Sequence, residues 1–181
     1  MHPFEAISND IGIWIFMALL LLTVILSIVM FFVDKPLRTK AARLGMVSAQ
    51  LAGSVSKAQE ILDSWDTMAR IHAAFSLGLD YLYLLSYSNT IGLACILAAS
   101  EFQAQGWFLV FWGAPLAWGQ WLAALLDSVE NIALFFMFRG DVREPWPKIA
   151  YWCAVPKFLL VIAGIAYALI GFFVWLIMLI F

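Results

Sequence analysis

Charged residues are scarce in this chain of 181 residues. Asp, Glu, Lys and Arg make up 12% of the sequence, hydrophobic residues make up 65%, and the mean hydropathy is +0.94. A soluble domain is about 25% charged, and a short soluble chain buries only part of its apolar surface. The composition therefore predicts that the solvent of this protein is lipid, and it favours an all-α integral membrane protein.

Cysteine, histidine and clustered basic residues are also rare, and each scarcity argues against a class of function. Cys95 and Cys153 lie in different apolar segments without metal-ligand spacing, which predicts two small buried side chains. His2 and His72 supply no histidine pair within an apolar segment, so haem ligation by two histidines is not expected. The net charge of −2 offers no basic patch for phosphates. We therefore expect no cofactor, no metal ion and no nucleic-acid partner.

Four apolar segments are long enough to cross a bilayer, which takes about 20 residues in a helix. They are residues 11–33, 71–99, 107–138 and 150–181. Pro156 removes a backbone donor, so the fourth span proper is expected to begin near it, with Ala150–Val155 at the interface. The leader carries Glu5 and Asp10 and no Lys or Arg, which argues against a cleavable signal. The prediction is a single membrane domain, residues 1–181, built as a bundle of four transmembrane helices.

The positive charges gather in two of the connecting loops. Six of the ten Lys and Arg lie between the first two spans, three lie between the last two, and Lys157 begins the fourth span. The N-terminal segment, the "EFQAQG" turn and the C-terminal end contain none. By the positive-inside rule, both basic loops are cytoplasmic and both termini lie on the non-cytoplasmic side.

The first basic loop has an apolar stripe at helical spacing within residues 41–69. Its members recur three and four residues apart and are Leu44, Val47, Leu51, Val55, Ala58, Leu62 and Trp65. Such a stripe predicts a cytoplasmic amphipathic helix, which would lie along the inner membrane surface or dock under the bundle. Gly45 and Gly53 weaken the helix, so two shorter helices are the alternative.

Ionisable residues occur inside three of the predicted spans at similar depth. With a rise of about 1.5 Å per residue, Asp80, Asp127, Glu130 and Lys157 each lie about 14–18 Å from the charged cytoplasmic end of their segment. An ionised side chain that faces lipid costs several kcal/mol, so such residues turn inward and pair or line water. These four residues are therefore expected to meet inside the bundle.

Further polar side chains share helix faces with these ionisable residues. In the second span they follow a helical spacing of three and four, and in the third span they share one side. We therefore predict one ligand-binding cluster, whose members are Asp80, Tyr83, Tyr87, Gln120, Asp127, Glu130, Asn131 and Lys157.

The cluster has a structural and a functional interpretation. Lys157 could pair with Asp127 or Glu130 and fix the register of the helices without any further role. The three carboxyl groups outnumber the single lysine, however, and an unpaired buried carboxylate is costly. The functional interpretation is that the excess acid binds a proton, a cation or a cationic ligand.

Two stretches of the sequence resemble a known group of proteins. Residues 58–134 include "GLDYLY" and "LDSVEN", and they look like a group of small bacterial membrane proteins without an assigned activity. The resemblance implies a multi-pass protein of the bacterial inner membrane. It implies no catalytic role for any residue.

Three functions follow as hypotheses. The first is a small membrane protein whose acid-rich pocket on the cytoplasmic side binds or passes a small ligand, a lipid headgroup or a cation. The alternatives are an accessory or structural subunit of a larger membrane complex, and an intramembrane acid–base enzyme acting on a lipid-like substrate. No nucleophile or substrate is specified, so catalysis is the least favoured. The expected partners are membrane lipids, with other membrane subunits or a second copy of the chain as alternatives.

Overall fold

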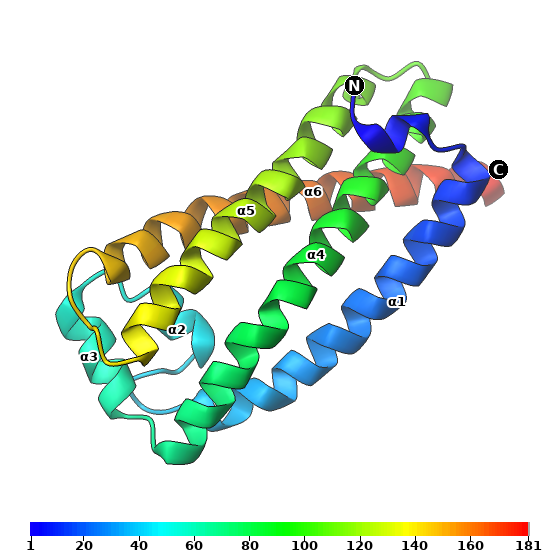
Figure 1. Cartoon of the computed structure of the whole chain (residues 1–181). Helices are drawn as coiled ribbons and strands as arrows, with labels where there is room; N and C mark the ends of the chain where they lie inside the picture. The colour runs from blue at the N-terminus through cyan, green and yellow to red at the C-terminus, as the bar shows by residue number, and fades with distance from the viewer. Residues whose placement is uncertain (181) are drawn as a thin grey trace. The chain divides into compact units, whose positions relative to one another are not determined.

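The computed structural model describes residues 1–180, which form helices and connecting turns without any strand (Figure 1). The four long helices are α1 (Asn9–Asp34), α4 (Thr67–Ala104), α5 (Gly113–Phe138) and α6 (Trp146–Ile180). Each is long and apolar enough to cross a membrane, and these four segments are the ones that the hydropathy of the sequence predicts. The all-α prediction with four such helices is therefore confirmed.

Helices α1 and α4 extend beyond the predicted boundaries at both ends. Helix α4 begins at Thr67 because the Asp66 carboxylate accepts the backbone N–H of Ala69 at 2.8 Å, which satisfies one unpaired donor of the first turn. The predicted third span starts with a 3₁₀ helix, η3 (Phe108–Trp112), which passes into α5 at Gly113.

Helix α6 differs from the prediction at its start. It begins at Trp146, with Pro147 in the first turn, where a missing backbone donor costs nothing. It then continues without a break through Pro156. Lys157 therefore lies in the interior of a continuous helix, and the start of the span proper near Pro156 stays a prediction.

The segment between α1 and α4 forms two short helices, α2 (Met46–Gln50) and α3 (Val55–Asp63), which is the second alternative given by the sequence. Gly53 lies between them with a φ of +67°, a conformation that side chains other than glycine rarely adopt. The Ser54 hydroxyl then accepts the backbone N–H of Lys57 at 3.3 Å and caps α3.

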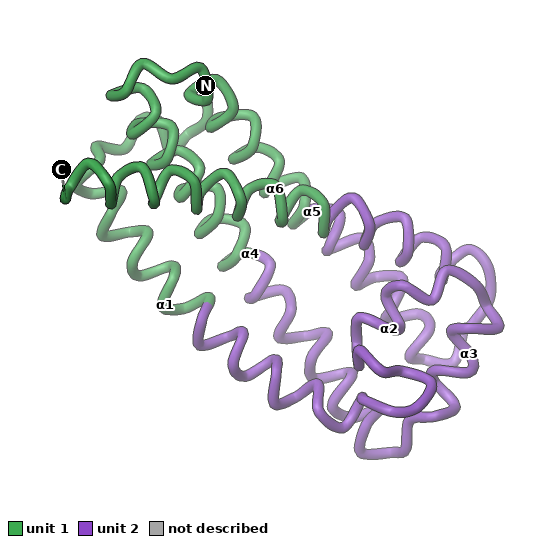
Figure 2. The backbone as a smooth tube through the Cα atoms, turned by 180° about the vertical axis from the view of Figure 1, so that it is seen from behind, with its two compact units in different colours: residues 1–23, 85–124, 158–181 green, residues 24–84, 125–157 purple. Residues whose placement is uncertain are grey.

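The chain divides into two compact units (Figure 2). Unit 1 comprises residues 1–23, 85–124 and 158–181, and unit 2 comprises residues 24–84 and 125–157. Each of the four long helices contributes one part to each unit.

Unit 1 packs through small and aromatic side chains. Its buried apolar core consists of Cys95, Ile96, Ala98, Phe102, Ala117, Tyr167 and Val174. A Cβ added at Gly171 would overlap the Cα and Cβ atoms of Ala98, so α4 and α6 approach closely at this point. The Tyr167 hydroxyl donates to the backbone oxygen of Leu109 at 2.8 Å, which joins α6 to η3.

Unit 2 buries the second half of the apolar stripe of the first loop, from Ala58 to Trp65. Ala58, Ile61 and Leu62 of α3 belong to a core that also contains residues of α4, α5 and α6. The buried Trp65 side chain follows α3, and its indole N–H donates to the backbone oxygen of Leu37 at 2.9 Å. Of the two placements expected for the stripe, α3 therefore docks its apolar face against the long helices.

Candidate functional site

Five of the predicted site residues come together within unit 2. Asp80 lies on α4, Asp127, Glu130 and Asn131 lie on α5, and Lys157 lies on α6. Their exposed fractions are 9% for Asp80 and no more than 4% for the other four residues. We call these five residues the acidic cluster.

Lys157 is the centre of two buried ion pairs. Its ammonium nitrogen lies 2.7 Å from Asp127 Oδ1 and 2.7 Å from Glu130 Oε2. Asp127 and Glu130 are three residues apart on α5, so both carboxyl groups reach the same side of that helix. Because each of the three charges has left water, the pairs must recover a desolvation cost of several kcal/mol per ion.

Asp80 belongs to the same charge network. The Asn131 side-chain amide donates to Asp80 Oδ2 at 2.6 Å, which joins α4 to α5. Asp80 also interacts electrostatically with Asp127 and Lys157, and Glu130 interacts with Asp80 and Asp127. The four ionisable groups therefore form a single cluster rather than two independent pairs.

The acidic cluster contains more acid than base. Three carboxyl groups surround one ammonium group, and Glu130 Oε1, on a side chain that is 0% exposed, has no hydrogen-bond donor. Unpaired negative charge in a site of low dielectric constant is costly. The chemistry of the cluster is therefore suited to holding one further positive charge.

A groove on the surface of unit 2 reaches the acidic cluster at one residue, Asn131. It has a volume of about 360 Å³ and lies between α4 and α5, lined by Leu77, Gly78 and Tyr81 on one side and by Asn131 and Phe135 on the other. Asn131 is the cluster member in its wall, and the same amide holds Asp80. A small molecule in the groove would therefore touch the cluster through Asn131.

The remaining predicted site residues are Tyr83, Tyr87 and Gln120. Tyr83, one turn along α4 from Asp80, accepts a hydrogen bond from the Ser27 hydroxyl of α1 at 3.2 Å. Tyr87 and Gln120 belong to unit 1. The Gln120 amide donates to the backbone oxygen of Leu160 at 2.9 Å, where it ties α5 to α6.

Sequence reasoning missed the hydroxyl groups of α1. In unit 1 the Thr23 hydroxyl lies 2.7 Å from that of Ser86 and 2.8 Å from that of Thr90. Thr23 and Ser27 are one turn apart in an otherwise apolar helix, and Ser86 and Thr90 are one turn apart on α4. This matched spacing was a usable signal for contact between the first and second spans.

No group of three or more His, Cys, Asp or Glu side chains in residues 1–180 has an arrangement that could hold a metal ion. A comparison with protein families, curated proteins and solved structures finds no match for this chain. The assignment of a function therefore depends on the geometry of the acidic cluster.

Proposed function

We propose that the protein is a small multi-pass membrane protein that binds or passes a small cation at the acidic cluster, the proton being the smallest such ligand. The single observation that carries this proposal is the gathering of three carboxyl groups around one lysine at buried positions on three helices. Because an unpaired buried carboxylate is costly, this excess of acid favours a further positive charge at the cluster.

The distribution of charge supports an orientation in an inner membrane. All ten Lys and Arg belong to unit 2, and unit 1 contains none. Under the positive-inside rule, the two basic loops face the cytoplasm, and both termini lie on the non-cytoplasmic side. The cluster would then open toward the cytoplasmic half of the membrane.

The size of the groove supports a small ligand. Ligand sites for small molecules begin at about 300 Å³, and the groove at Asn131 has about 360 Å³. Protons, alkali cations and small organic ammonium groups fit this space, which reaches the cluster at Asn131. Each of them would offset part of the excess negative charge of the three carboxyl groups.

The proposal is tested with the isosteric substitution Glu130→Gln, which leaves the Lys157–Asp127 ion pair in place. The midpoint of thermal unfolding of the purified protein is measured in an uncharged detergent, first as the pH is varied. It is then measured in sodium, potassium and tetramethylammonium chloride at matched ionic strength. We expect one of these cations, or the proton, to stabilise the wild-type protein. That stabilisation should disappear in Glu130→Gln.

Glu60→Gln is the matched control, because the Glu60 side chain is exposed and pairs only with Lys57 on the same helix. It should respond to every cation as the wild-type protein does. If no cation and no change of pH alters the stability of the wild-type protein, the cluster only fixes helix register and the proposed function is wrong.

A second candidate function is that of an accessory subunit, and the exposure of α1 favours it. Only 6% of the most apolar stretch of the α1 segment is buried, against 56% for α4. A partner helix could cover that surface, although lipid alone would also satisfy it. Purification in mild detergent tests this function, since a subunit should keep a stoichiometric partner that is lost when Ile13 and Met17 of α1 are replaced by bulkier residues.

A further inference from the structure

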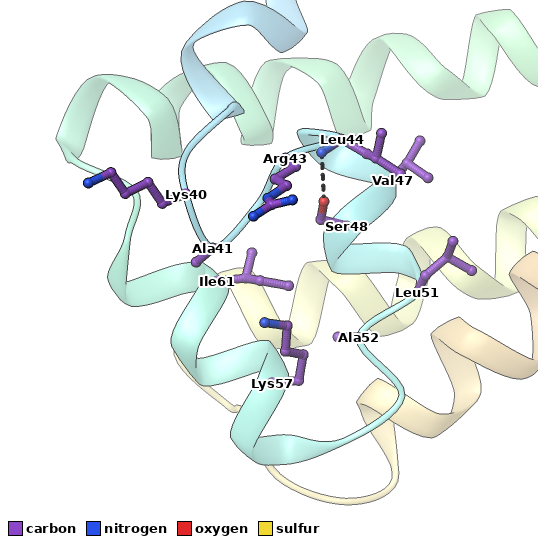
Figure 3. A pocket seen from close by; sticks show the side chains of 10 residues that line it. All are labelled: Lys40, Ala41, Arg43, Leu44, Val47, Ser48, Leu51, Ala52, Lys57 and Ile61. Atoms are coloured by element: carbon purple, nitrogen blue, oxygen red, sulfur yellow. Dashed lines mark hydrogen bonds between the residues drawn. The ribbon is translucent and has the colours of Figure 1, made fainter.

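A second pocket of unit 2 lies in the first loop, and no member of the acidic cluster lines it. It has a volume of about 560 Å³ and is formed by the chain before α2, by α2 itself and by α3 (Figure 3). Three basic residues line it, Lys40, Arg43 and Lys57, together with apolar side chains such as Leu44 and Leu51. It therefore combines positive charge with an apolar wall.

The charges of this pocket are available to an anion. Arg43 is exposed, and no residue in 1–180 forms an ion pair with it or with Lys40. Lys57 is bound to Glu60 at 2.8 Å, but both of these side chains are exposed, and a surface pair of this kind contributes little. In Figure 3 the guanidinium group of Arg43 and the ammonium group of Lys57 extend toward the same space beside Ile61, whereas Lys40 extends outward at the rim.

The apolar wall lies on the other side of the pocket. Leu44 is 61% exposed, and Val47 and Leu51 continue the wall along α2. Figure 3 shows these three side chains on the side of α2 away from Lys40. A simple anion would use only the charged side, whereas an amphiphile with an anionic head would use both.

The chain places this pocket close to the end of an apolar span. The first apolar segment ends at Leu37, and Lys40 follows three residues later. Three residues of fully extended chain reach at most about 11 Å. Two rings at the end of α1, Phe31 and Phe32, lie under the Lys35 ammonium at 5.3 and 4.5 Å, an arrangement typical of a side chain at a membrane interface. The pocket is therefore within reach of lipid headgroups when α1 crosses a membrane.

We propose that this pocket binds an anionic phospholipid of the adjacent leaflet, with the phosphate between Arg43 and Lys57 and the upper part of an acyl chain along Leu44 and Leu51. Arginine binds phosphate oxygens with two parallel N–H donors, and lysine adds a point charge. The inference rests on the proposed insertion of the chain into a membrane, but it does not depend on cation binding at the acidic cluster.

The test uses the full chain purified in an uncharged detergent and three probes. They are dioctanoyl phosphatidylglycerol, dioctanoyl phosphatidylcholine and inorganic phosphate, and binding is measured by native mass spectrometry and by the shift in thermal unfolding. We expect phosphatidylglycerol to bind and the other two probes to bind far more weakly. A basic residue near an anionic surface contributes about 1 kcal/mol, so R43Q/K57Q should weaken binding about 30-fold.

Two further variants keep the test specific. R139Q/K148Q removes two exposed basic residues of unit 2 that do not line the pocket, and it should bind phosphatidylglycerol as the wild-type protein does. Leu44→Ser changes an exposed apolar residue of the wall and should weaken binding of the lipid without unfolding the protein.

Three results would overturn the inference. Equal binding of phosphatidylcholine would show that the negative charge of the headgroup does not contribute to binding. Equal stabilisation by inorganic phosphate would show an anion site rather than a lipid site. Wild-type affinity in R43Q/K57Q, or an equal loss in R139Q/K148Q, would show that this pocket does not bind the lipid. None of these results bears on Glu130→Gln and the cation response, so the two proposals can fail separately.

Discussion

The two units of this chain hold the same four helices together by different means. Unit 1 has no Lys or Arg and only three acidic residues, and its helices meet at glycines, hydroxyl groups and aromatic rings. Unit 2 has all ten basic residues and nine acidic ones. Its helices α5 and α6 meet at buried ion pairs, and the Asn131–Asp80 hydrogen bond joins α4 to them. The packing of unit 1 therefore depends on the close approach of its helices, and the packing of unit 2 depends on the balance of its buried charges.

This difference bears on the proposed function. Close packing of small residues fixes a structure but offers no group that exchanges a proton or an ion. A buried cluster of ionisable groups is costly to desolvate, and such clusters occur often at functional sites. We therefore expect unit 1 to respond to changes of volume, and unit 2 to respond to changes of charge.

The largest effect should come from Lys157→Met in unit 2. This change leaves Asp127 and Glu130 without their shared cation, and loss of one partner of a buried pair costs about 3–5 kcal/mol. Unfolding by a denaturing detergent in mixed micelles measures the loss of free energy of unfolding. Lys148→Met, which breaks an exposed pair with Glu144, should cost less than about 1 kcal/mol. Equal effects of the two changes would contradict the charge-balance account.

A smaller effect is expected from Gly171→Ala in unit 1. The new methyl group would overlap the backbone of Ala98, so α4 and α6 must move apart, at a cost of about 1–3 kcal/mol. Gly78→Ala is the control in unit 2, because a Cβ there meets no atom within 4 Å and the change should be neutral or stabilising. Thermal unfolding of both variants measures the difference, and an unaffected Gly171→Ala would show that close packing does not hold unit 1 together.

The hydroxyl contacts of unit 1 should contribute still less. Thr23→Val removes hydrogen bonds to Ser86 and Thr90, and such bonds between helices in a membrane average about 0.6 kcal/mol. A double-mutant cycle with Thr90→Val isolates the Thr23–Thr90 coupling. A coupling as large as the loss in Lys157→Met would remove the contrast between the two units.

The smallest effect concerns the pH response of the N-terminal segment of unit 1. His2 is buried against Phe4, Trp118 and Trp121, and its Nδ1 accepts the backbone N–H of Phe4 at 3.2 Å. Burial lowers the pKa of His2, with a further lowering by the N-terminal amino group and an opposing effect of Glu5. The neutral form therefore favours the folded segment, and this stability is lost as the pH falls below the ordinary value of about 6.5.

Hydrogen exchange of the amides of residues 2–7, corrected for intrinsic rates, measures this response. Protection should fall on acidification in the wild-type protein. It should stay constant in His2→Asn, because asparagine keeps a side-chain acceptor at the cap but does not titrate. Equal loss of protection in both proteins would exclude His2 as the cause.

Sequence reasoning predicted the elements of this fold better than their ends. Apolar length identified all four long helices, and Gly53 indicated the break between α2 and α3. It did not predict the start of α6 at Trp146, four residues before the predicted segment. Helix α6 continues through Pro156, because one lost hydrogen bond is tolerated inside a long helix that neighbouring helices support.

The acidic cluster was predicted through depth. Counting residues from the charged loops placed Asp80, Asp127, Glu130 and Lys157 at one level, and the structure brings them together. The sequence left open whether Lys157 pairs with Asp127 or with Glu130, and the structure pairs it with both. This pairing could not be predicted, because depth along a helix does not say how the side chains of neighbouring helices meet.

The central claim is that the acidic cluster holds a positive charge beyond that of Lys157. Infrared spectroscopy of the purified protein at neutral pH, in a buffer with little salt, tests this claim most directly. A protonated carboxyl group has its own carbonyl band, and exposed carboxyl groups do not contribute to that band because they are ionised at neutral pH. The account predicts such a band in the wild-type protein and its loss in Asp80→Asn, Asp127→Asn or Glu130→Gln, but not in Glu60→Gln. The absence of any protonated carboxyl band from the wild-type protein, with its fold intact, would contradict the account.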